Sequence, residues 1–150
     1  MWRFYRRRRP KRASTVTKHY LEHKEAAREL LLARLTYWNQ HYGFEYNRVA
    51  IRNQRRCWGS CSSNRNLNFS YKLMFLPECL MDYVIVHELC HLKEMNHGLK
   101  FWQLVGAAMP DYKERRAELR RIEKTVGNAA HNLEKEKAAH GLATCAYCMK

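Results

Sequence analysis

The stretch VIVHELCHLKEMNH, residues 84–97, places two imidazoles and a carboxylate inside an apolar run that is typical of a helix. His87 and His91 are four residues apart, so on a helix their rings lie one turn apart on the same face. The neighbouring Val84, Ile85 and Leu89 indicate that this helix is buried. Burying two imidazoles and a carboxylate without partners costs several kcal/mol, and a shared metal ion would remove that cost.

The order of these residues is the HExxH pattern, in which two histidines bind zinc. Glu88 projects beside the histidine pair, which suits a carboxylate that contacts a water molecule without binding the metal. Hydrolytic zinc sites use three protein ligands, and His97 is the predicted third. Six residues turn a helix by about 600°, so the chain must leave the helix between Lys93 and Asn96. The alternative interpretation is a pair of core histidines with a solvent-facing glutamate.

The whole chain is short and strongly basic. Its 150 residues suffice for one domain, and no apolar run approaches the length needed to span a bilayer. The N-terminal MWRFYRRRRPKR lacks the apolar stretch of a signal peptide, so we expect a soluble cytoplasmic protein with no membrane partner. The 28 Lys and Arg against 14 Asp and Glu give a net charge of +14. That charge favours nucleic acid as a partner, although a merely solvated basic helix face explains it more simply.

The cysteines are expected to be free thiols, because no export signal accompanies them. Cys145 and Cys148 form a lone CxxC motif. With His131 and His140 they could supply a second metal site, but nothing else in the sequence supports one. The interpretation that we prefer is a loosely held tail over residues 127–150.

The first half of the chain combines one long helix with strand patterns. A basic flexible arm over residues 1–13 precedes a helix predicted from Thr17 to His41, which Thr17 caps and Gly43 stops. Alternation over residues 44–51 and a strand-turn-strand pattern over residues 57–71 predict a small antiparallel sheet.

The second half of the chain is predicted to be helical. The HExxH helix follows Pro77, a second helix covers residues 99–109, and a charged helix runs from Asp111 to about Val126. We therefore predict one α+β domain over residues 14–126, with an N-terminal long helix, a small antiparallel sheet, the HExxH helix and C-terminal helices.

Beyond the motif, the region from Gly43 to Val105 resembles the YgjP-like metallopeptidase domain, a family related to the WLM and SprT groups. The matching segments are, in order, YNRVAIRNQ, WGSCSSNRNLNFSYKLMFLP and DYVIVHELCHLKEMNHGLKFWQLV. With the preceding helix, the resemblance covers about residues 17–125. It implies a compact zincin-like fold.

The resemblance also implies an activity and a site. It implies a zinc metallopeptidase that hydrolyses peptide bonds of a protein or peptide substrate through a zinc-activated water. One zinc ion would be bound by His87, His91 and His97, with Glu88 as the catalytic acid/base. The SprT-related members imply the alternative, a nucleic-acid-associated zinc protein that is either a DNA-recruited protease or a binding module with structural zinc.

Two further expectations concern the substrate. A donor that stabilises the developing oxyanion is expected from a Tyr, His or Arg near the site, and the sequence leaves the candidates Tyr71, Tyr83 and Tyr112 unranked. The strand at Leu67–Ser70 is expected to be a sheet edge to which an extended substrate adds as a further strand.

Two segments are expected to support the site by packing. In the WGSC segment, residues 58–61, the side chains should pack on the HExxH helix, with Gly59 at a turn or a close approach. Phe101 and Trp102 follow His97 closely and should act as core anchors that hold this third ligand still.

Overall fold

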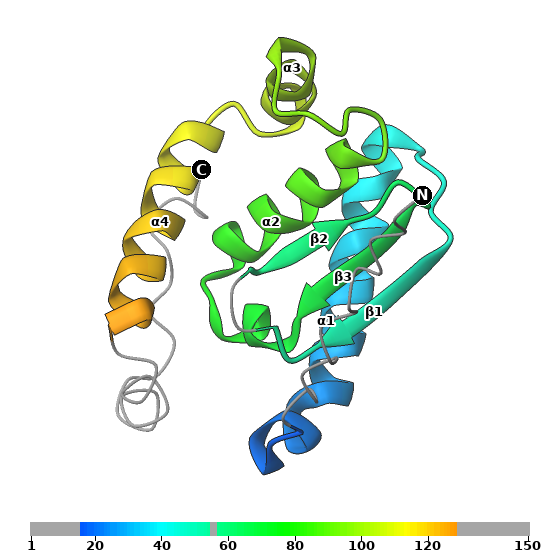
Figure 1. The fold of residues 1–150 in the computed structure, drawn as a ribbon. Coiled ribbons are helices and arrows are strands. Elements are labelled where there is room, and N and C mark those ends of the chain that lie inside the picture. The colour runs from blue at the N-terminus through cyan, green and yellow to red at the C-terminus, as the bar shows by residue number, and fades with distance from the viewer. Residues whose placement is uncertain (1–15, 55–56, 129–150) are drawn as a thin grey trace, which may run out of the picture.

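The computed structural model describes residues 16–54 and 57–128 of the chain. The elements occur in this order: α1 (Lys18–Tyr42), β1 (Arg48–Arg52), β2 (Gly59–Cys61), β3 (Asn66–Ser70), the short 3-10 helix η1 (Tyr71–Phe75), α2 (Glu78–His91), α3 (Leu99–Ala108) and α4 (Tyr112–Asn128). In Figure 1, α1 crosses behind the sheet, α2 runs beside β2, and α3 and α4 lie beyond α2. Helices combined with one small sheet confirm the α+β class.

Helix α1 begins and ends where the sequence predicted. The Oγ1 atom of Thr17 accepts a hydrogen bond from the N–H of Tyr20 at 3.2 Å, which satisfies one free donor of the first turn. Gly43 adopts a left-handed φ of 62°, and its N–H donates to the carbonyl of Asn39 at 2.7 Å. The helix buries one stripe against the rest of the domain, formed by Ala27, Leu31 and Leu35.

A partly buried ion pair joins α1 to α2. The guanidinium of Arg34 donates from both Nε and Nη2 to the carboxylate of Asp82, with the Nε to Oδ1 distance at 2.8 Å. The Asp82 hydrogen bond, which outweighs the opposing effect of burial, raises the pKa of Arg34 above its ordinary value. This bidentate contact fixes the rotation of α2, which carries the HExxH residues.

The sheet is mixed, so the prediction of an antiparallel sheet is wrong for one strand pair. The strand order is β1-β3-β2. β2 and β3 form the predicted antiparallel hairpin, with Ser60 opposite Asn68, whereas β1 is parallel to β3, with Ile51 opposite Phe69. β2 therefore runs opposite to β1, and β3 lies between them in the direction of β1.

This strand order also corrects the expected substrate edge. Leu67–Ser70 belongs to β3, the central strand, so both of its backbone edges are already paired. The edges of the sheet are β1 and β2. In β3 Leu67 and Phe69 are fully buried on the helix side, while Asn66 and Asn68 on the other face are half-buried.

The remaining predictions about chain organisation concern its ends. α4 runs to Asn128, slightly beyond the predicted end near Val126. The basic arm over residues 1–13 and the Cys145 to Cys148 motif, with its two nearby histidines, lie outside the described residues. Across the part of the chain that the structure describes, no helix has both the length and the apolar character to cross a membrane.

Candidate metal centre

Helix α2 carries the first two histidines and is buried almost all round. It begins after Pro77 and ends at His91, and α1, β2, α3 and α4 all pack against it. This explains why its sequence is mostly apolar, with Glu78, Asp82 and the motif residues as its charged or imidazole positions. The helix ends slightly earlier than the predicted break after Lys93, and the following loop brings His97 back toward α2.

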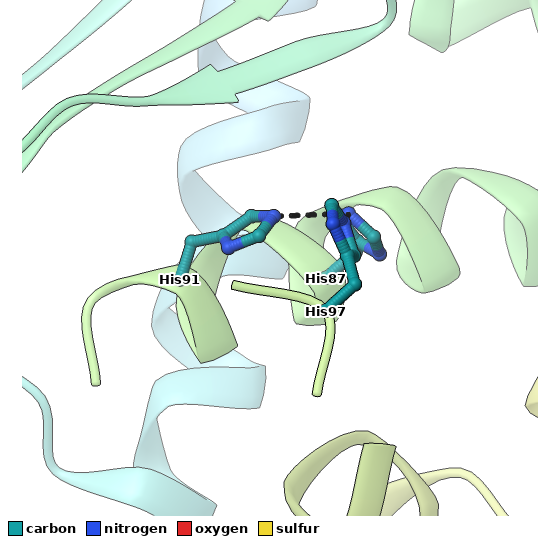
Figure 2. Close-up of side chains that lie close together, drawn as sticks. All are labelled: His87, His91 and His97. Atoms are coloured by element: carbon teal, nitrogen blue, oxygen red, sulfur yellow. Dashed lines mark hydrogen bonds between the residues drawn. The ribbon is translucent and has the colours of Figure 1, made fainter. Parts of the chain in front are cut away.

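The three predicted histidines converge on one point, as Figure 2 shows. The Nε2 atom of His87 lies 3.2 Å from Nε2 of His91 and 3.0 Å from Nε2 of His97. One nitrogen from each ring lies within 4.8 Å of the other two. With zinc to nitrogen bonds of about 2.0–2.1 Å, two nitrogens of a tetrahedral site are about 3.3–3.4 Å apart. The two spacings from His87 are close to that value.

The hydrogen bonding of His91 determines which of its nitrogens faces the cluster as an acceptor. Its Nδ1 lies 3.0 Å from the carbonyl oxygen of Glu94, and a carbonyl can only accept. Nδ1 therefore carries the proton, and the neutral ring presents the lone pair of Nε2 to His87 and His97. Lone pairs directed at a common point repel one another unless a cation lies between them, so the donor set fits a metal ion.

Burial keeps the helical imidazoles in the form that binds metal. Burial, followed by the charges of His91, His97 and Arg116, lowers the pKa of His87 to about 3. The pKa of His91 is lowered as well, again chiefly by burial. Both rings are thus neutral at pH 7, and metal binding there requires no loss of a proton.

Glu88 is buried beside the histidines and has a close backbone neighbour in β2. Its side chain is 6% exposed, and burial raises its pKa to about 8. Within the described residues its Oε2 atom has no hydrogen-bond partner. Gly59 provides the space, because a Cβ on Gly59 would lie 2.8 Å from Oε1 of Glu88. Gly59 therefore makes the close approach that the sequence allowed.

The third histidine, His97, is exposed but supported on two sides. The indole Nε1–H of Trp102 donates to its carbonyl oxygen at 3.0 Å. The fully buried ring of Phe101 lies under all three imidazoles, with centroid distances of 4.9 Å to His87, 4.6 Å to His91 and 4.8 Å to His97. These contacts match the expectation that both aromatic residues anchor the loop.

A cavity of about 230 Å³ opens beside His87 and Glu88. Of the three tyrosines considered as oxyanion donors, Tyr83 lines it, and burial raises the pKa of this phenol to about 12. Tyr71 instead lies against α1, where its hydroxyl is 3.1 Å from Nδ1 of His19. Tyr112 stacks on Trp102 with ring centroids 5.3 Å apart. The structure thus ranks Tyr83 first by position.

Two cavity residues, Arg116 and Arg120, were missed from the sequence. Both come from α4, together with Leu119 and Glu123, so one helix face lines the cavity. The spacing of these four residues is that of a single helix face, and this was the available signal. In the sequence the charges favoured a solvated surface, because nothing local shows that α4 lies over α2.

Comparisons with known proteins agree with this geometry. The family described as YgjP-like, metallopeptidase domain, matches residues 4–122 of the chain. A search of curated proteins found no match to this chain. Among solved structures it is similar to the metallopeptidase zymogen of Pyrococcus abyssi abylysin, with a TM-score of 0.56 and 23% identity, covering 61% of this chain and 93% of that chain. That likeness supports the fold, and the family match over most of the sequence shows that the chain belongs to the YgjP-like metallopeptidase family.

Proposed function

We propose that the protein is a zinc-dependent peptidase in which His87, His91 and His97 bind one zinc ion and Glu88 is the catalytic acid/base. The observation that carries the proposal is the convergence of three imidazole nitrogens next to a buried carboxylate. Three protein ligands leave a fourth position for water or substrate, which is the arrangement of hydrolytic zinc sites.

The residues of this chain divide the chemical work. A zinc ion held by the histidines would polarise the scissile carbonyl and make a water molecule more acidic. Glu88 can accept a proton only as a carboxylate, and the positive charge of a zinc ion held by the histidines would favour that form against the burial that raises its pKa. Its Oε2 atom, which has no partner among the described residues, would then accept a proton from the attacking water. The same carboxylate then delivers that proton to the leaving amine nitrogen, which completes peptide hydrolysis.

We also propose that Tyr83 donates a hydrogen bond to the carbonyl oxygen of the substrate. Its raised pKa of about 12 keeps the phenol protonated at neutral pH, so it can donate a hydrogen bond. It lines the same cavity as His87 and Glu88. Donation to the developing negative charge stabilises the tetrahedral transition state more than it stabilises the ground state.

The substrate backbone is proposed to dock along β2 rather than along β3. β2 is an edge of the sheet, and Gly59 at its start lines the cavity beside Glu88. An extended peptide that pairs with this edge would pass the site in a fixed register. N-methylation of single substrate amides should then lower kcat/KM at alternate positions, and equal effects at every position would argue against strand pairing.

The central experiment compares zinc-loaded wild type with Glu88→Gln on a fluorogenic peptide library. The variant should retain one zinc per chain and lose about a hundredfold to ten-thousandfold in cleavage rate. Glu22→Gln serves as the matched control, because that glutamate is exposed on α1. A wild type that binds no zinc, or a Glu88→Gln variant that cleaves normally, would contradict the proposal.

A nucleic-acid-associated role is the second candidate, and the net charge of +14 is the observation that favours it. Salt-dependent DNA binding that survives Glu88→Gln and falls on removal of residues 1–12 would support it. Absence of DNA binding at low salt would reject it, whatever the peptidase result.

A further inference from the structure

Helix α4 presents two arginines to the cavity beside the metal centre. Arg116 and Arg120 line it with Leu119 and Glu123, on one face of the helix. From Arg116 to Glu123 the helix rises by about 10 Å, so the arginines lie along the first part of this face and the glutamate at its far end. Leu119 is buried and fixes the face against the domain.

Neither of these arginines is neutralised by a contacting carboxylate of the described chain. The ion pairs of the described residues involve other cations, and Glu88 and Glu123 pair with neither arginine. By contrast the preceding residue, Arg115, donates from Nε to Oδ2 of Asp111 at 2.8 Å and from Nη1 to the carbonyl of Cys79. One arginine of α4 therefore serves the fold, while two face the cavity without an anionic partner.

Arg116 is held in place although it has no carboxylate partner. Its guanidinium carbon lies 4.6 Å from the centroid of the Trp102 ring, a cation-π contact. Trp102 in turn donates to the carbonyl of His97 and stacks on Tyr112. Arg116 is thus tied through one indole to the loop that carries the third histidine. Such pre-organisation reduces the entropy lost when an anion binds.

We propose that Arg116 and Arg120 form a carboxylate-binding subsite that selects peptides with an acidic group next to the scissile bond. The proposal rests on the peptidase function above and adds its substrate class. Guanidinium groups bind carboxylates through charge-assisted, often bidentate hydrogen bonds. The carboxylate can belong to an Asp or Glu side chain, or to the C-terminus of the substrate, and both sources satisfy the same chemistry.

The test uses quenched peptides that differ only in the carboxylate. One pair carries Glu or Gln at a position flanking the cleaved bond, and a second pair ends in a free acid or an amide. The zinc-loaded wild type should prefer the acidic member of one pair by roughly tenfold in kcat/KM, the order expected of a charge-assisted hydrogen bond. A preference within the first pair identifies the side chain, and a preference within the second identifies the C-terminus.

Three variants localise the preference. Arg116→Gln and Arg120→Gln should each remove most of it, while Lys113→Gln removes an exposed charge of α4 outside the cavity and should leave it intact. Arg116→Glu should reverse the preference toward Lys at the same position. Because Arg120 is exposed, Arg120→Gln remains informative if a change at Arg116 disturbs folding.

A binding measurement separates this inference from the peptidase proposal. The same peptides are titrated into zinc-loaded Glu88→Gln protein, with the intrinsic tryptophan fluorescence, to which Trp58 of the cavity contributes, as the readout. Tighter binding of acidic peptides that Arg120→Gln abolishes supports the subsite, even if the wild type cleaves nothing. Equal binding and equal cleavage of acidic and neutral peptides overturn the subsite and leave the peptidase proposal intact.

Discussion

Replacing Gly59 with alanine should slow peptide cleavage while the metal ligands stay in place. A Cβ at residue 59 would lie 2.7 Å from Cγ and 2.8 Å from Oε1 of Glu88. Nonbonded carbon atoms prefer about 3.5–4.0 Å, so the Glu88 side chain must retreat by roughly 1 Å. A displacement of that size at a reacting group costs about a hundredfold in rate.

The assay should separate this displacement from a general loss of structure. We expect kcat to fall about a hundredfold, with KM, zinc content and melting temperature nearly unchanged, because one side chain can rotate away without moving α2. Gly106→Ala is the matched control, since its Cβ would lie 3.4 Å from Tyr112, an ordinary contact. If Gly59→Ala cleaves peptides at the wild-type kcat, the inferred dependence of Glu88 on this glycine is refuted.

Three further substitutions test the centre and its support. In a chelator competition, His97→Ala should weaken zinc binding by at least about a hundredfold. Unchanged zinc affinity and stoichiometry would reject the three-histidine site. Trp102→Phe keeps a ring but removes the donor to the carbonyl of His97, so zinc affinity should fall about tenfold with the melting temperature preserved. Asp82→Ala leaves Arg34, whose side chain is 24% exposed, without its main partner and should cost roughly 3 kcal/mol in urea unfolding. The control Glu22→Gln changes a side chain that is 52% exposed, so the free energy of unfolding should change by less than about 0.5 kcal/mol. Similar losses in the two variants would contradict the inference that the Arg34 to Asp82 ion pair stabilises the fold more than an exposed pair does.

Local features of the sequence predicted the helices and the cluster of histidines well. Thr17 and Gly43 marked the ends of α1 because capping and left-handed backbone depend on single residues. The four-residue spacing of His87 and His91 predicted that they share one helix face, because the period of a helix is also a local property. His97 was placed by chemistry instead, because a hydrolytic site needs a third ligand, and the structure brings its ring to the other two.

Strand partners and helix docking could not be predicted in this way. The alternation of apolar and polar residues located the strands, but it does not show which strand is central in the sheet. From the sequence, β1 was therefore assigned the wrong direction relative to β3. The face of Arg116, Leu119 and Arg120 was visible in the sequence, yet only the packing of α4 on α2 shows what it faces. Both errors concern contacts between residues far apart in the chain.

The central position of β3 has a consequence for the order of assembly during synthesis. β1 and β2 precede it in the chain, yet both pair with it, so neither has a sheet partner until residues 66–70 have emerged. Glu88, which must settle against Gly59, is made later still. The pairing of β1 with β3 and the contact of Gly59 with Glu88 join residues well apart in the chain, and such contacts delay folding. The proposed hydrolytic centre can therefore form only after the residues of β3 and α2 have both emerged.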